Sequence, residues 1–404
     1  MQCAICKGRG LCGKPCPILQ QFKQFQAKIK TDFSGSSPPD VFVGRHNYPN
    51  VFTGILAPQD HGDTEELSMP EVWHEKNVGI QDILSYRSRL IYSRFTANIK
   101  SRVERNLDVM KEVAMASKPA DVEVHLKRKP SLKIHADPFM PIIGNPAPLN
   151  WARLQENIKV EGKVEYLVSD TDVKSATALT ELHDSNISVS SMIKLLSAGL
   201  LGMKTRRKLV PTRWAITAVD STISELLLDK IRYYPQISEF LLFNAEYIGN
   251  HYEIILFPKE FSFEVIEAKM PGSVWNPAGV DKGSQPLMMQ DYENWHGRKD
   301  YAAEVTGGYY VARIALAEYL SRIRKQASCL VLRECRPEYY APCGVGVLRE
   351  TCRDAFSKKP EVFQTAQQAL NAAQQRMKLP VSKFLEKSQL WSEFKVQKRI
   401  FDFI

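Results

Sequence analysis

The chain has 404 residues, of which 44% are hydrophobic and 25% are charged, as in an ordinary soluble globular protein. No apolar run approaches the roughly 18 residues that a membrane-spanning helix needs, which excludes that class of protein. The formal net charge of +9, from 54 basic and 45 acidic residues, weakly favours a polyanionic partner such as nucleic acid. The first residues lack the basic region and apolar stretch of a signal peptide, so we expect a cytoplasmic protein with no membrane partner.

Half of the eight cysteines lie within the first sixteen residues. Cys3, Cys6, Cys12 and Cys16 have the spacing C-x2-C-x5-C-x3-C, with three glycines between them and a proline after the last. Four thiolates this close in sequence can converge on a tetrahedral ion, and the bound metal then folds a segment too small for its own core. We predict a metal-binding module over 1–33 that holds zinc. An iron–sulfur cluster is the alternative, because Cys-Pro also ends ferredoxin-like cysteine runs.

The first apolar pattern after this module predicts a strand, a polar turn and a second strand within 41–56. The turn holds Arg45, His46 and Asn47. Such residues between buried strands favour a phosphate-binding or catalytic loop, and a purely structural turn is an equally good interpretation. Residues 34–39, just before it, are Ser/Pro-rich and are predicted to form a loop.

The middle of the chain alternates between helical and extended patterns. Periodicity predicts a helical region over 79–117, and alternation predicts a strand over 122–126. A proline-rich connector is expected over 138–148. Residues 209–220 are predicted to form a buried strand that ends at Asp220, just before a helix. A carboxylate at that position is a functional candidate in α/β proteins, although it also serves as a simple helix cap.

A β-hairpin is predicted over 239–257, with His251 and Glu253 at the start of its second strand. Further along, Gly307 and Gly308 precede a predicted helix. Two glycines at a helix N-terminus let a phosphate approach the free amides there, although the signal is weak without a longer glycine motif.

The densest group of titratable and aromatic residues spans 291–300 and includes His296. A turn-rich loop over 336–345 contains Arg336 and Glu338. The remaining cysteines have irregular spacing in apolar surroundings, which favours buried thiols over a second metal site. They are Cys329, Cys335, Cys343 and Cys352.

The last residues, after an amphipathic segment over 381–396, read Gln-Lys-Arg-Ile-Phe-Asp-Phe-Ile. Gln397, Ile400 and Phe403 recur every third residue, so one 3₁₀ turn places them on a single edge with Ile404 beside them. An exposed apolar peptide of this form fits the pocket of a partner, and packing on its own domain is the alternative. The pattern resembles the tail by which replication and repair proteins dock on the sliding clamp (PCNA), with an isoleucine in place of the second aromatic residue.

Several segments together resemble the archaeal Nre ("novel repair") proteins over nearly the full length. The resemblance implies an archaeal DNA-repair factor that binds the sliding clamp; it implies no particular activity. The residues that carry it are the cysteine quartet, Val43-Gly44, Tyr48-Pro49, residues 208–220, residues 249–252, residues 307–310, residues 336–340 with Pro342, and the tail.

These patterns together predict a mixed α/β protein. We expect a metal-binding module over 1–33, one large α/β core over 40–380, and an amphipathic segment with the docking tail over 381–404. The expected function is DNA repair at the clamp, with action on phosphodiester or nucleotide substrates as a phosphodiesterase or nuclease. A non-enzymatic DNA-binding adaptor that links the clamp to other repair factors is the alternative.

A hydrolase of this kind needs carboxylates or imidazoles for a general base or metal, and cations for the phosphate. The candidates for the first role are His46, Asp220, His251, Glu253, His296 and Glu338. The candidates for binding phosphate or substrate are Arg45, Asn47, Arg213, Gly307, Gly308 and Arg336. At least three of Arg45, His46, Arg213, Asp220, His251 and Glu338 are expected to line one pocket, because polar residues flanked by buried strands converge at strand ends. If all six lay on unrelated surfaces, the adaptor would be favoured.

Overall fold

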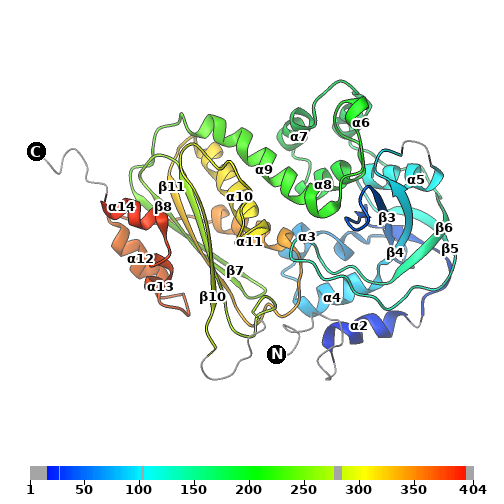
Figure 1. The fold of residues 1–404 in the computed structure, drawn as a ribbon, viewed down its shortest axis with the longest axis horizontal. Coiled ribbons are helices and arrows are strands. Elements are labelled where there is room, and N and C mark those ends of the chain that lie inside the picture. Colours follow the sequence, from blue (N-terminus) through cyan, green and yellow to red (C-terminus); the bar gives the residue numbers. More distant parts are fainter. Residues whose placement is uncertain (1–15, 27, 102–103, 277–283, 397–404) are drawn as a thin grey trace, which may run out of the picture. The chain divides into compact units, whose positions relative to one another are not determined.

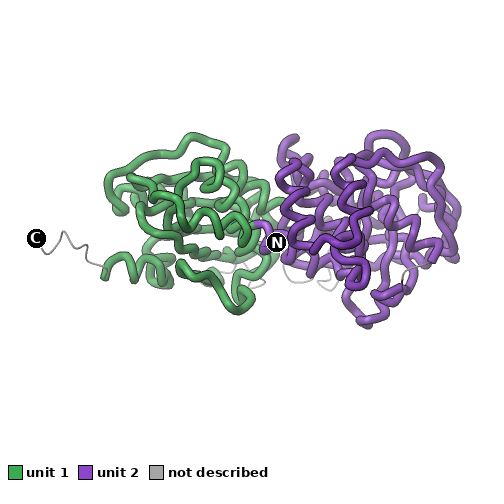
Figure 2. The backbone as a smooth tube through the Cα atoms, turned by 90° about the horizontal axis from the view of Figure 1, so that it is seen from above, with its two compact units in different colours: residues 1–5, 224–340, 347–404 green, residues 6–223, 341–346 purple. Residues whose placement is uncertain are grey.

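The structure is a computed structural model that describes residues 16–26, 28–101, 104–276 and 284–396. The chain divides into two compact units, coloured separately in Figure 2. Unit 2 comprises 6–223 and 341–346, and unit 1 comprises 1–5, 224–340 and 347–404. Each unit has its own mixed six-stranded sheet with helices, which confirms the mixed α/β class. The range 40–380, predicted as one core, is thus shared between two units.

The sheet of unit 2 has the strand order β1-β5-β6-β4-β3-β2. All neighbouring strands are antiparallel except β4 and β6, which pair in parallel. The strands are β1 (Asp32–Ser37), β2 (Val41–Val43), β3 (Asn50–Ala57), β4 (Ile91–Asn98), β5 (Ala120–Leu126) and β6 (Pro146–Leu154).

Helices cover this sheet because each presents one apolar face. In α5 (Arg105–Met115) the buried side chains Leu107, Met110, Val113 and Ala114 follow the helical repeat. This helix contacts β3, β6 and α8, while α2 contacts α4. The other helical elements of unit 2 are α2 (Pro17–Gln26), η1 (Glu65–Leu67), α3 (Pro70–Glu75), α4 (Ile80–Arg89), α6 (Gly162–Ser169), α7 (Ser175–Asp184), α8 (Val189–Ser197), η2 (Lys204–Arg206) and the first part of α9 (Thr212–Ile231).

The sheet of unit 1 has the strand order β10-β9-β11-β8-β7-β12, with β9 and β11 parallel and the other neighbours antiparallel. The strands are β7 (Phe240–Tyr247), β8 (Asn250–Phe257), β9 (Ser262–Lys269), β10 (Leu287–Glu293), β11 (Ser328–Cys335) and β12 (Glu361–Phe363).

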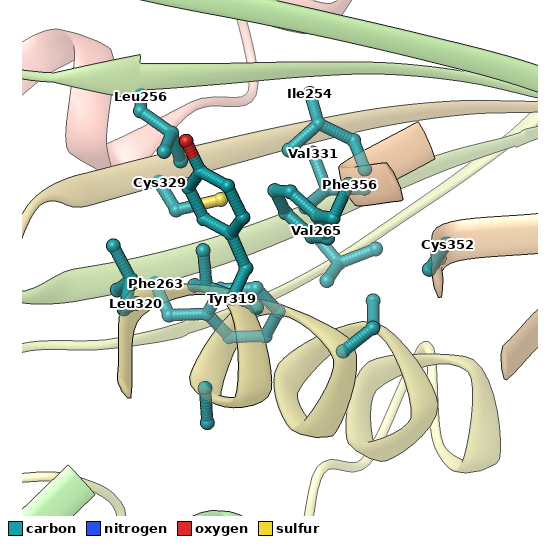
Figure 3. Close-up of a cluster of buried hydrophobic side chains, with 14 of the residues drawn as sticks. Ile254, Leu256, Phe263, Val265, Tyr319, Leu320, Cys329, Val331, Cys352 and Phe356 are labelled. Atoms are coloured by element: carbon teal, nitrogen blue, oxygen red, sulfur yellow. The ribbon is translucent and has the colours of Figure 1, made fainter. Parts of the chain in front are cut away.

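Both faces of this sheet are buried, so unit 1 has three layers. Figure 1 shows α10 (Gly307–Ile323) and α11 (Val345–Ser357) on one side of the sheet. The other side carries α12 (Ala366–Gln374), α13 (Val381–Leu385) and α14 (Gln389–Val396). Successive strand side chains alternate between two hydrophobic clusters, and Figure 3 shows the α10 side, where Ile254 and Leu256 face Tyr319 and Phe356. Ile255 and Phe257 point to the α12 side.

Three local predictions are wrong. Residues 34–39 contain most of β1. This strand pairs with β5, and its small side chains are largely buried. The predicted helical region 79–117 contains β4 between two helices. Residues 212–220 begin the helix α9, because Ile216, Val219 and Ile223 repeat at helical spacing and the proline before the first turn fits a helix start.

The predictions that rested on strict alternation or on turn glycine are confirmed. They are the strand–turn–strand at 41–56, the strand at 122–126 and the hairpin at 239–257. The four later cysteines are buried free thiols, as expected. No described helix combines the length and the apolar character that crossing a membrane requires.

Candidate functional site

The turn between β2 and β3 presents an arginine and a histidine side chain. The hairpin is closed by Gly44, whose N–H donates to the carbonyl of Phe52 at 2.8 Å. Asn47 has a left-handed backbone with φ of 62°, which asparagine tolerates well, and its carbonyl accepts from Asn50 at 2.8 Å. Arg45 and His46 on this turn are both exposed. A short, closed turn therefore holds them at a fixed place in unit 2.

A pocket of about 280 Å³ lies beside this turn, within unit 2. Four segments build it: the β2–β3 hairpin, the first half of β4, the loop between β5 and β6, and the start of α9. One wall is apolar and aromatic, and the other groups are cations and imidazoles. The lining residues used below are Phe42, Arg45, His46, Phe52, Tyr92, Arg94, Lys133, His135 and Arg213.

The charge of the pocket is positive. Arg45 and Lys133 are exposed, and neither has an ion-pair partner among the residues that the structure describes. The guanidinium of Arg94 lies 4.2 Å from the centre of the Phe52 ring. No Asp or Glu is found among the described lining residues. Uncompensated cations that face a hollow attract anions, and phosphate is the anion that arginine and lysine bind most often.

A buried carboxylate holds Arg213 in place. Asp137 is only 3% exposed and accepts a hydrogen bond from Nη1 of Arg213 at 2.7 Å. Its other oxygen accepts from the N–H of Phe139 at 2.8 Å, and the Arg213 guanidinium lies 4.2 Å from the Phe139 ring centre. The hydroxyl of Thr212 accepts from the N–H of Val43 at 3.0 Å, which ties α9 to β2. Hydrogen bonds thus join the walls of the pocket, and none of these bonds involves Arg45 or Lys133.

Two imidazoles and a phenol complete the site. The rings of His46 and His135 are nearly perpendicular, with centroids 6.4 Å apart. Burial lowers the pKa of His135; the nearby carboxylate of Asp137 opposes this effect, and the cations Arg45 and Arg213 add to it. His135 is therefore neutral at pH 7 and can accept a proton. Burial raises the pKa of Tyr92, whose hydroxyl has no hydrogen-bond partner within the described ranges.

Of the residues predicted for a site, Arg45, His46 and Arg213 line this pocket. Asn47 lies in the same turn but not in the lining. Asp220 is fully buried inside α9 rather than at a strand end, because 212–220 is helical. Their chemical roles remain predictions.

Sequence reasoning missed several lining residues. Tyr92 and Arg94 were assigned to a helix, whereas they lie on β4. Lys133 and His135 lie in a loop with no regular periodicity. The signal that points to them is a run of Lys, His and Asp beside prolines, between two strands.

Another set of predicted residues gathers in unit 1, in a network of ion pairs. His251 Nε2 lies 2.9 Å from Glu253, and Nδ1 lies 3.2 Å from Glu246. Arg336 contacts Glu246 at 2.7 Å and Glu334 at 2.8 Å. Arg376 pairs with Glu253 at 2.8 Å. Each of these side chains has an oppositely charged or hydrogen-bonding partner within the network. The pairing compensates the cost of burying them, and none of these side chains is left unpaired to bind a ligand.

The other candidates lie elsewhere in unit 1. His296 follows β10, and its N–H donates to Asn294 at 3.0 Å. The exposed Glu338 lies 3.3 Å from Lys378. Gly307 and Gly308 are buried at the start of α10. A Cβ on Gly308 would lie 2.6 Å from Glu267, so the glycine makes room for a buried carboxylate.

The predicted metal site and the docking tail fall largely outside the described residues. Cys3, Cys6 and Cys12 precede residue 16, and Gln397, Ile400, Phe403 and Ile404 follow residue 396. Cys16 is described; it is buried and forms no disulfide. In the part of the chain that the structure describes, no group of three or more His, Cys, Asp or Glu residues is placed to hold a metal.

Comparisons with known proteins give one consistent family. Residues 11–276 match the family described as archaeal Nre, N-terminal, and residues 293–403 match archaeal Nre, C-terminal. The chain is 37% identical to DNA repair protein NreB of Archaeoglobus fulgidus, over 96% of this chain and 97% of the relative. It is 38% identical to DNA repair protein NreA of the same organism, over 93% of this chain and 94% of the relative. It is 34% identical to DNA repair protein NreA of Haloferax volcanii, over 96% of this chain and 93% of the relative. No solved structure matches the chain.

Proposed function

Because the chain belongs to the archaeal Nre family, we propose that it is a DNA-repair protein whose unit 2 pocket binds the phosphate backbone of a DNA strand. The names of its relatives support the process, and the pocket supports the ligand. The observation that carries the proposal is the pair Arg45 and Lys133, two exposed cations that face one hollow without a described carboxylate partner. Proteins hold DNA chiefly through such contacts to phosphate oxygens.

A second hollow supports a binding surface longer than one phosphate. It has a volume of about 160 Å³ and is lined by Lys111, Lys204 and Lys208, among others. The segment 204–213 contributes to both hollows. From Leu209 in one hollow to Arg213 in the other, the chain spans at most roughly 14 Å. In this proposal, one strand contacts both sets of cations.

The tail supplies recruitment in this proposal. Gln397, Ile400, Phe403 and Ile404 keep the spacing of a sliding-clamp docking peptide at the end of the chain. The clamp would bring the protein to DNA, and unit 2 would then engage the strand.

The cysteine quartet is proposed to bind zinc, with an iron–sulfur cluster as the alternative. In either case it would fold the N-terminal segment. Elemental analysis and an absorption spectrum of the purified protein distinguish zinc, iron and no metal.

The binding proposal is tested by removing the two unengaged charges. Arg45→Gln with Lys133→Gln keeps the side chains polar and breaks no ion pair that the structure describes. We expect DNA affinity, measured by fluorescence anisotropy, to fall at least about tenfold.

The matched control is Lys383→Gln with Lys387→Gln, which removes the same net charge from exposed positions in unit 1. It should bind DNA like the wild type. Equal losses in both variants would show that overall charge, rather than the pocket, holds DNA.

A second candidate function is hydrolysis of a phosphoester in the same pocket. The specific observation is the facing pair of His46 and His135, with His135 kept neutral by burial. A neutral imidazole can act as general base on a water molecule, and the neighbouring cations can stabilise charge on the phosphate.

Replacing the imidazole separates this enzyme from the non-enzymatic adaptor. For an enzyme, His135→Asn should abolish cleavage of a labelled oligonucleotide while its affinity changes little. If the wild type cleaves no DNA with or without added metal ions, the adaptor function stands alone.

A further inference from the structure

Two large aromatic side chains stand exposed on segments that also contribute residues to the pocket. Tyr48 is 44% exposed and Trp214 is 46% exposed, although aromatic rings of this size are usually covered. Their ring centroids lie 5.4 Å apart with an angle of 54° between the planes. The rings therefore contact each other and still leave much of their surface open to solvent.

Their place in the chain connects them to the cations. Tyr48 belongs to the turn that carries Arg45 and His46, and Trp214 directly follows Arg213. The hydrogen bond from Val43 to Thr212, 3.0 Å long, joins these two segments. The same two segments thus supply Arg45 and Arg213 of the pocket together with the aromatic pair.

We propose that Tyr48 and Trp214 form a stacking platform for an unpaired base, so that unit 2 binds single-stranded DNA with a phosphate in the pocket and the neighbouring base on the rings. This inference rests on the proposed function, since it takes the phosphate-binding pocket as given. It adds the class of DNA that the site recognises.

The physical reason is the geometry of bases. In a duplex both faces of each base are covered by its neighbours, so a side chain at the groove meets only base edges and backbone. An unpaired base has free faces, and an aromatic ring can stack on them whatever the sequence. Cations that follow the backbone combined with exposed aromatics are the usual elements of sites for single strands.

A third partly exposed aromatic ring lines the pocket itself. Phe52 is 36% exposed, lines the pocket and lies under the guanidinium of Arg94, at 4.2 Å. Phe52 therefore offers part of an aromatic ring to a strand whose phosphate lies in the pocket. The arrangement favours several consecutive unpaired nucleotides over a single free nucleotide.

The experiment compares three labelled 12-mers of one sequence: single-stranded DNA, the DNA duplex and single-stranded RNA. They are titrated with the full-length wild type and with Tyr48→Ala/Trp214→Ala. We expect the double variant to lose at least about tenfold in affinity for single-stranded DNA and to change less than about twofold on the duplex. Tyr48→Phe/Trp214→Phe, which keeps the rings, should bind like the wild type.

Tyr166→Ala is the matched control, because Tyr166 is 57% exposed in unit 2 and does not line the pocket. It should leave binding unchanged. A direct readout is tryptophan fluorescence: single-stranded DNA should quench the wild-type emission, and Trp214→Phe should lose most of that quenching while it still binds. This readout does not depend on whether the double alanine variant folds.

Unchanged affinity of the double alanine variant for single-stranded DNA would overturn the inference, as would equal losses on single strand and duplex. Binding of the RNA 12-mer without binding of the DNA would overturn it too. If Arg45→Gln/Lys133→Gln loses DNA while the aromatic variant does not, only the stacking platform fails. If both variants bind like the wild type, the proposed function fails with it.

Discussion

Nη1 of Arg213 donates to Oδ2 of Asp137 at 2.7 Å, and this pair fixes one wall of the cationic pocket. The side chain of Asp137 is 4% exposed and that of Arg213 is 24% exposed. Asp137 therefore neutralises Arg213 from the buried side, while the guanidinium still lines the hollow. The arrangement orients one cation and leaves Arg45 and Lys133 to provide the uncompensated charge.

Removing the guanidinium should destabilise the protein. Arg213→Met leaves Asp137 buried without its cation, and breaking a buried pair in this way costs about 3–5 kcal/mol, less here because Arg213 is partly exposed. We expect a loss of about 2 kcal/mol in unfolding free energy, measured by urea denaturation. Asp137→Asn/Arg213→Met should recover part of that loss, because no unpaired charge then remains. Additive losses in the double variant would contradict the pairing.

His135 should make stability depend on pH on the acid side. Burial lowers its pKa in the folded state below the ordinary value near 6.5, so below that pH the unfolded chain binds a proton that the folded chain does not. The unfolding free energy contributed by this group is present above pH 6.5 and is lost as the pH falls toward the folded-state pKa. In His135→Asn the slope of unfolding free energy against pH, below pH 6.5, should decrease by an amount that corresponds to at most one proton per molecule. The measurement is a series of denaturation curves between pH 4 and 8, and identical slopes in both proteins would contradict it.

The tail should be needed for clamp binding and not for stability. Burial of one such side chain is worth about 1.5–3 kcal/mol, and every 1.4 kcal/mol is roughly tenfold in affinity. Ile400→Ala with Phe403→Ala should therefore weaken binding to the clamp at least about a hundredfold, even after ordering costs. Calorimetric titration of the clamp measures this.

Thermal melts of the same two proteins provide the control. A docking tail predicts an unchanged melting temperature. A tail that packs on its own domain predicts a melting temperature several degrees lower, together with unchanged clamp affinity.

The sequence predicted those parts of the fold in which local pattern and tertiary environment agree. The turn with Arg45 and His46 lies between two short apolar strands, and its polar residues have no competing periodicity. The hairpin at 239–257 was predicted from its turn glycine; the structure places the turn at Ile248-Gly249, with Asn250 already in β8. The prediction failed at 209–220, where a dense apolar run is compatible with both a buried strand and a buried helix. Length decides between them, because α9 continues to Ile231.

The site itself was only partly predictable, because its residues come from four separate segments. Nothing in the local pattern around His135 or Tyr92 shows that β4 and the β5–β6 loop meet at the hairpin turn. That proximity depends on the parallel pairing of β4 with β6, a connection between distant strands. Residue type was enough to select Arg45, His46 and Arg213 as candidates. Only the order of strands in the sheet shows that Lys133 lies in the same pocket.

The salt dependence of DNA binding tests the central claim most directly, because each lost phosphate contact lowers the slope of log affinity against log salt by a known amount. For a single strand that amount is about 0.7 per contact. The slope for Arg45→Gln/Lys133→Gln should therefore be shallower than that of the wild type by about 1.4, and Lys383→Gln/Lys387→Gln should keep the wild-type slope. If the pocket variant has the wild-type slope, Arg45 and Lys133 do not contact phosphate and the account is wrong.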